Sequence, residues 1–82
     1  MHESGMIEEL IEKVQSAALE NGAVRVLSIG VAIGDLGMIE PDHLREHFEI
    51  ASMGTLAQGA ALRVRTCEEP FGLLLESMEL ET

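Results

Sequence analysis

Aromatic and basic residues are scarce in this chain of 82 residues, and each shortage excludes a class of function. There is no Trp or Tyr and there are only two Phe, so the chain offers almost no surface on which nucleic-acid bases can stack. Five Lys and Arg stand against 15 Asp and Glu, and the formal net charge of −10 repels phosphate backbones and anionic lipid surfaces. We therefore expect no nucleic-acid and no membrane partner, whereas the acidity suits a cationic protein surface or a metal cation.

Cysteine and long apolar runs are also lacking. Cys67 stands alone and cannot form an internal disulfide, so nothing in the sequence points to an oxidising compartment. No basic segment followed by an apolar stretch opens the chain, which argues against a signal peptide. No apolar run approaches the roughly 20 residues that a membrane helix needs. The expected location is the cytoplasm.

Nearly half of the residues are apolar, which is enough for one small core, so residues 1–82 are expected to form a single domain. Apolar residues recur at helical spacing after Ser4, a plausible N-cap, and Asn21-Gly22 is a typical helix stop. Pro41 is favoured at the first position of a helix and places Glu40 at the N-cap. The expected elements are a helix over 5–21, a strand over 24–34, a helix over 41–51, and strands over 61–66 and 73–81.

Alternation along the strands predicts how they pack. In the first strand, simple alternation places Leu27 and Ile29 on the face that packs against the helices, and Val26 on the other face. The last two strands are joined by a short connection and are expected to pair as a hairpin, with Arg63 and Arg65 facing the acids of the last strand. Two helices can cover only one face of a three-stranded sheet. The predicted fold is therefore a two-layer α+β domain in the order α-β-α-β-β.

The amino terminus carries the first candidate site, Met1-His2-Glu3. The amine of Met1, the backbone nitrogen of His2 and the imidazole of His2 can close adjacent chelate rings on one metal, and the backbone nitrogen of Glu3 completes a square. Such a nitrogen-rich square-planar set favours Ni(II) or Cu(II). With unperturbed pKa values of about 7.7–8.0 for the amine and about 6.5 for His, binding is expected to weaken as the pH falls through that region. A histidine near the start of a chain is also common without any metal.

Other candidates are weaker. His43 and His47 are four residues apart on one helix face and can bind a metal, but a solvated face with two incidental histidines explains them as well. Cys67 has no second cysteine with which to complete a zinc site and no pattern of an activated nucleophile around it. The chain shows no phosphate-binding loop and no catalytic triad. The sequence therefore predicts that the protein is not an enzyme.

Several segments in the right order resemble the hydrogenase nickel-incorporation accessory proteins of the HypA/HybF family. That family opens with Met-His-Glu followed by a helix, as here, and has a strand ending in an Ile-Gly pair, like Ile33-Gly34. A second helix ending near a Phe-Glu pair is matched by Phe48-Glu49. The later matches are Gly54-Thr55, the strand start Gly59-Ala60-Ala61-Leu62, and the Glu-rich close Glu76-Ser77-Met78-Glu79-Leu80-Glu81.

The resemblance implies a nickel metallochaperone that binds Ni(II) through Met1, His2 and Glu3, with Glu40 at the position of an acidic residue that assists in some members. It implies delivery of nickel to the hydrogenase large subunit with a partner GTPase, and in some organisms service to urease. The family also inserts a zinc domain with two CxxC pairs between the last two strands. Here Cys67-Glu68-Glu69-Pro70 stands in that place, so zinc is not expected.

Two questions stay open at this level. The chain is interpreted as a nickel-delivery domain, and the alternative is a HypA-like interaction or regulatory module that docks a partner through its acidic surface and no longer delivers metal. A core this small is marginal. We therefore expect either a monomer or a homodimer that pairs through an exposed strand edge.

Overall fold

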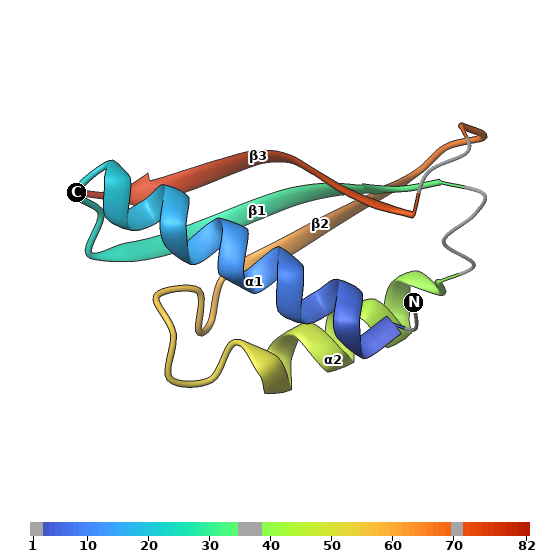
Figure 1. Ribbon diagram of the computed structural model, residues 1–82, viewed down its shortest axis with the longest axis horizontal. Helices are drawn as coiled ribbons and strands as arrows, with labels where there is room; N and C mark the ends of the chain where they lie inside the picture. The colour runs from blue at the N-terminus through green and yellow to red at the C-terminus, as the bar shows by residue number, and fades with distance from the viewer. Residues whose placement is uncertain (1–2, 35–38, 70–71) are drawn as a thin grey trace.

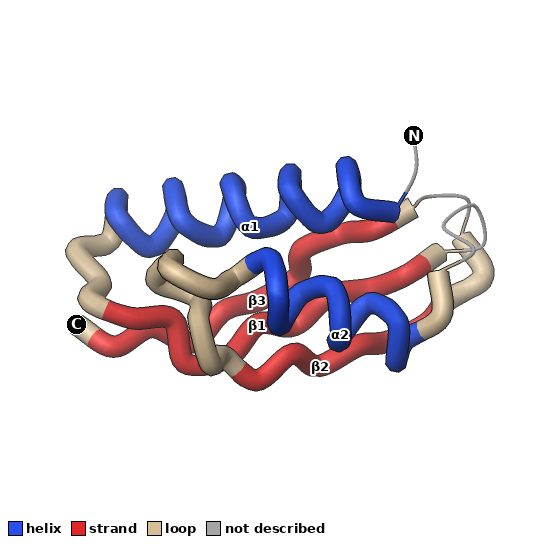
Figure 2. Tube along the Cα trace, turned by 90° about the horizontal axis from the view of Figure 1, so that it is seen from below, coloured by secondary structure: helices blue, strands red, loops and turns tan. Residues whose placement is uncertain are grey.

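The computed structural model describes residues 3–34, 39–69 and 72–82 and has the expected five elements in the expected order (Figure 1). Both helices cover the same face of the sheet, so the predicted two-layer α+β fold is confirmed (Figures 1 and 2). No helix in these ranges is both long and apolar enough to cross a membrane. The elements are α1 (Glu3–Glu20), β1 (Arg25–Ile33), α2 (Pro41–Ala51), β2 (Ala61–Thr66) and β3 (Leu73–Glu81).

The strand order is β2-β1-β3, so the expected hairpin of the last two strands is wrong. Strand β1 lies in the middle, parallel to β2 and antiparallel to β3. The six residues Ser28–Ile33 are all buried. This segment therefore needs a neighbouring strand on each side, which only the central position of the sheet provides. Helix α2 is the crossover that a parallel β1–β2 pair requires. Only the other side of β1 is then left for β3.

Two β-bulges change which residues face the helices. In the β1–β3 register, Val26 pairs with Leu80 and Ser28 with Glu79, which leaves Leu27 as an extra residue. Because a one-residue insertion switches the faces, Val26 joins the core at 1% exposure while Leu27 is 44% exposed. The expectation that Leu27 packs against the helices is therefore wrong.

The second bulge lies in β3. Gly30 pairs with Ser77 and Val31 with Leu75, which leaves Glu76 unpaired in the register. The bulge lets four apolar side chains on either side of Glu76 pack against the core, although simple alternation would divide them between two faces. They are Leu73, Leu75, Met78 and Leu80.

The helices follow the sequence pattern closely. Helix α2 begins at Pro41, and Leu44 and Phe48 are its buried residues, whereas Ala51, expected beside them, is exposed. Helix α1 ends before Asn21-Gly22, with Gly22 at φ 67°, a conformation that glycine adopts without strain. Ser4 lies inside α1 and is not its N-cap, because the helix already includes Glu3. The apolar stripe of α1 in the core consists of Ile7, Leu10, Ile11, Val14 and Ala18.

The face of the sheet without helices carries ion pairs that reach across β1. Arg65 contacts Glu76 at 2.5 Å and Arg63 contacts Glu79 at 3.7 Å, so the arginines face the acids of β3 as expected, although β1 lies between them. The hydrogen bond from Arg65 holds the pKa of Glu76 below its ordinary value and raises the pKa of Arg65. Because these pairs are exposed, they orient the strands more than they stabilise the fold.

Candidate metal site

The predicted metal site begins where α1 begins. Met1 and His2 lie outside the described residues, and Glu3 is the first residue that the structure describes, already within α1. The first four backbone N–H groups of an α-helix have no intrahelical partner. The backbone nitrogen of Glu3 is therefore not required by the hydrogen bonds of the helix.

Glu40 is held at the start of α2 by its neighbours. It takes the N-cap position with an extended backbone (φ −81°, ψ 133°), and its carbonyl accepts the N–H of Leu44 at 3.0 Å. Its exposed side chain makes no capping hydrogen bond. Ile39, 8% exposed, anchors the chain just before it, and Pro41 fixes the backbone just after it. The backbone of Glu40 is thus held in place, and its carboxylate makes no capping hydrogen bond to the helix.

The two helix starts lie at the same end of the molecule. Figures 1 and 2 show α1 and α2 running in the same general direction, so that both begin at the end where β1 and β2 finish. The amino end of a helix carries partial positive charge, and two such ends together disfavour a bare cation. A metal held there needs anionic donors, and Glu40 places a carboxylate-bearing residue at the start of α2.

His43 and His47, the second candidate, lie together on α2. Their rings stack with centroids 6.2 Å apart and planes inclined by 24°, and both residues are exposed. Within the described ranges, no three His, Cys, Asp or Glu side chains gather in a way that would hold a metal ion. The structure thus brings the two imidazoles together without giving them a third ligand from that part of the chain.

Cys67 lies just beyond the end of β2. It is a half-buried free thiol, and its backbone N–H donates to the carbonyl of Ile33 at 2.9 Å. The adjacent Glu68 and Glu69 are exposed. The position of Cys67 is thus set by its backbone pairing with β1.

A feature that the sequence analysis did not single out is the exposed apolar side of α2. Ile50 is 71% exposed and Met53, just after the helix, is 65% exposed. The available signal was that Ile50 falls outside the stripe formed by Leu44 and Phe48. A helical pattern of apolar residues predicts which side chains are buried, and it does not predict a role for an apolar residue outside that pattern, such as Ile50.

The fold is that of a small two-layer α+β domain in which both helices start at the same end (Figure 1). A profile described as "Hydrogenase/urease nickel incorporation, metallochaperone, hypA" matches residues 1–71. The chain therefore belongs to the HypA family, as its sequence motifs indicated.

Individual relatives agree with the profile. The chain is 38% identical over 80 residues to the hydrogenase maturation factor HypA of Archaeoglobus fulgidus, covering 98% of this chain and 73% of that protein. It is 38% identical over 64 residues to the hydrogenase maturation factor HybF of Salmonella typhimurium, covering 78% of this chain and 57% of that protein. Both relatives are longer than this chain.

A solved structure shares the fold. The solution structure of the Ni metallochaperone HypA from Helicobacter pylori matches with a TM-score of 0.83, covering 99% of this chain and 98% of that one at 18% identity. At that identity the likeness concerns the fold.

Proposed function

We propose that this chain is a nickel metallochaperone domain that binds Ni(II) at its amino terminus and delivers it to the maturation of a [NiFe]-hydrogenase or a urease. The observation that carries the proposal is the match to the nickel-incorporation family, which begins at residue 1 and includes Met1-His2-Glu3. The role is one of binding and transfer, and it requires no catalytic residue.

Donor chemistry at the helix start supports nickel. The proposed set is the amine of Met1, the backbone and imidazole nitrogens of His2, and the backbone nitrogen of Glu3, which the hydrogen bonds of α1 do not require. A deprotonated amide nitrogen is anionic, so it offsets the unfavourable field at the amino end of the helix. Nitrogen donors in a square favour Ni(II) over the tetrahedral preferences of zinc. The carboxylate of Glu40 is the proposed assisting group.

The proposed partners are a maturation GTPase and the large subunit of the hydrogenase, and zinc is not part of the proposal. Structural zinc sites take four ligands, usually with paired cysteines. Cys67 is the only cysteine in the sequence. We propose that residues 67–70 stand where longer family members carry the zinc domain, so that residues 1–82 form the nickel domain alone.

The test is a calorimetric titration of Ni(II) into the untagged chain, with an intact-mass measurement to establish that Met1 carries a free amine. His2→Ala is expected to weaken binding at least about a hundredfold, because it removes the imidazole and opens a chelate ring. The matched control is the double variant His43→Ala/His47→Ala, which is expected to bind like the parent chain. Equal affinity in His2→Ala and the parent would refute the site, and loss in the control alone would move it to α2.

A further inference from the structure

The seam between α1 and α2 contains a groove that the proposed nickel site does not use. Two adjoining hollows form it, one on either side of the point where Glu8 of α1 faces Ala51 of α2. The first is also lined by Ile7, His47 and Ile50, and the second by Ile11, Glu12, Gln15 and Thr55. We call this surface the α1–α2 groove.

The groove is apolar at its floor, and its α2 side combines the apolar Ile50 and Ala51 with His47. Ile7 and Ile11 form the floor, at 1% and 8% exposure, and Ile50 stands at the rim with 71% of its surface exposed. Isolated apolar residues on a protein surface are ordinary. Here the exposed Ile50 lines the same hollow as the buried Ile7, and the buried Ile11 lines the adjoining one, so a side chain inserted there would contact apolar atoms.

The α1 side of the groove is acidic. Glu8 and Glu12 lie four residues apart, and neither Lys nor Arg is among the residues that line the groove. Like charges at this spacing repel one another on a helix surface. Lys13, the only basic residue of α1, lines separate hollows with Glu9 and so lies outside the groove. A cation brought by a partner would relieve this repulsion.

We propose that the α1–α2 groove docks an amphipathic, basic helix of a protein partner. An apolar stripe at i, i+3, i+4 and i+7 would cover Ile50 and the floor, in the manner of helix-in-groove recognition. Glu8 and Glu12 are four residues apart, roughly 6 Å along the helix axis, and Lys or Arg residues at i and i+4 of the docked helix reproduce this spacing. The partner is thus defined by its chemistry, namely one apolar stripe flanked on one side by cations.

The probe is a synthetic amphipathic peptide of about 14 residues, long enough for about four turns. It is built of Leu, Lys and Ala, with Leu in the stripe and Lys beside it. A second peptide of the same composition in scrambled order lacks the stripe. Titration into the nickel-free ¹⁵N-labelled chain is expected to shift the amide resonances of Glu8, Ile11, Ala51 and Thr55 with the first peptide and to leave them unshifted with the second. Because no nickel is present, the outcome is independent of the proposed function.

Matched variants assign the binding to the groove. Ile50→Gln is expected to weaken binding about tenfold, equivalent to about 1.4 kcal/mol, whereas Leu19→Gln removes an apolar residue of 62% exposure elsewhere and is expected to change nothing. Both residues are exposed, so neither substitution threatens the fold.

A second pair of variants tests the charges. Glu8→Gln/Glu12→Gln is expected to weaken binding about fivefold and to flatten its salt dependence, because two screened ion pairs are lost. Glu9→Gln/Glu20→Gln makes the same charge change on α1 outside the groove, and is expected to bind like the parent. Equal binding of the scrambled peptide, unchanged affinity in Ile50→Gln, or equal losses in variants and controls would each overturn the proposal.

Discussion

The bulge at Leu27 reverses which of two adjacent residues, Val26 or Leu27, should be sensitive to substitution, compared with simple alternation. We expect Val26→Thr to lower the free energy of unfolding by about 1–3 kcal/mol, because Val26 is 1% exposed and the new hydroxyl would be buried in an apolar core. We expect Leu27→Thr to change it by no more than about 0.5 kcal/mol, because Leu27 is 44% exposed and Thr favours strands. The same residue is introduced at adjacent positions, so the difference reports the bulge.

Urea unfolding measures both variants. A small domain has a slope of about 1–3 kcal/mol per molar urea, so a loss of about 2 kcal/mol moves the midpoint by roughly 0.7–2 M. Unchanged slopes are the control that the unfolded and native states stay comparable. A larger loss in Leu27→Thr than in Val26→Thr would place Leu27 in the core and refute the register.

Three further predictions concern the ion pairs, the close approach of β1 to β3, and the core. Arg65 lowers the pKa of Glu76 in the folded state, so the ion pair stabilises the fold above the unfolded pKa of Glu76 and this stabilisation is lost as the pH falls through the folded pKa. Glu76→Gln should therefore lose less stability than the parent between about pH 5 and pH 3, measured by urea unfolding at each pH. A Cβ at Gly30 would lie 2.5 Å from Oγ of Ser77, so Gly30→Ala should be about 0.5–1 kcal/mol less costly in a Ser77→Ala background, measured by a double-mutant cycle. Leu44→Ala, at a residue of 0% exposure, should cost about 2–5 kcal/mol by the same unfolding assay, and a loss below 1 kcal/mol would contradict its place in the core.

Local signals predicted the elements well because each has a local physical cause. Pro41 sets the start of α2 whatever surrounds it, and the alternation of Leu62 and Val64 with Arg63 and Arg65 defines β2 without reference to other strands. The helix-period stripe of α1 likewise needs only its own residues. These features are properties of the segment, so the sequence contains them completely.

Strand order and register were harder to predict because they result from competition between segments. Alternation correctly places Ile29 of β1 in the core, but it does not show where a bulge interrupts the pattern. The bulges at Leu27 and Glu76 then shift the faces by one residue, and no local residue preference marks them. The hairpin of β2 and β3 was expected from their short connection alone. The central place of β1 results instead from the need to bury β1, which an edge position would leave exposed.

The candidate site was hard to predict from the sequence for a different reason. Its proposed donors are mainly an amine and backbone nitrogens, which every chain possesses, so residue patterns around Met1-His2-Glu3 could not separate it from an incidental histidine. The resemblance to the HypA family favours the metal site, and the family match shows membership of the family, while the donors at Met1-His2-Glu3 stay a proposal. The structure adds the placement of Glu40 at a helix start at the same end of the molecule as the start of α1 (Figure 1).

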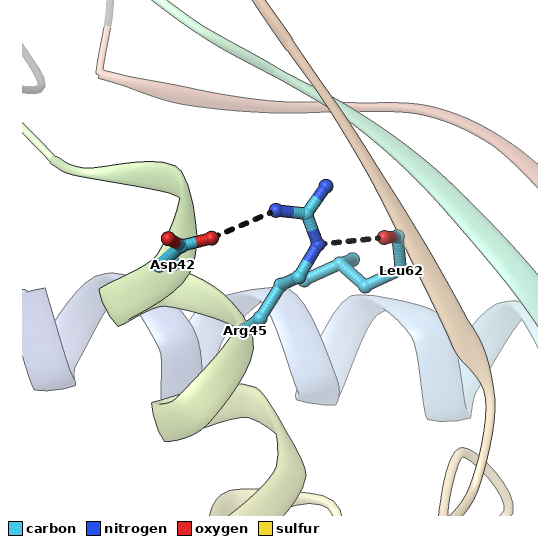
Figure 3. A network of polar contacts seen from close by, with 3 residues as sticks. All are labelled: Asp42, Arg45 and Leu62. Carbon is cyan, nitrogen blue, oxygen red and sulfur yellow. Dashed lines mark hydrogen bonds and ion pairs between the residues drawn. The ribbon is translucent and has the colours of Figure 1, made fainter.

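Arg45 shows how α2 also fixes the edge of the sheet. Figure 3 shows its Nε donating to the carbonyl oxygen of Leu62 at 3.4 Å, while its guanidinium lies 3.5 Å from Asp42. The contact falls on β2, which is an edge strand of the described sheet. A charged side chain over an edge carbonyl discourages pairing with a second chain. This arrangement argues against a homodimer through β2, whereas β3 forms the other edge of the described sheet.

The central claim is that nickel is held by the amine at the start of the chain. The most direct measurement compares Ni(II) binding to the chain with a free amine and to the same chain acetylated at Met1, with every side chain intact. Acetylation removes the amine donor, and we expect it to weaken binding by at least about a hundredfold, with the loss of the absorption typical of square-planar Ni(II). Equal affinity and an unchanged spectrum in the acetylated chain would contradict the claim.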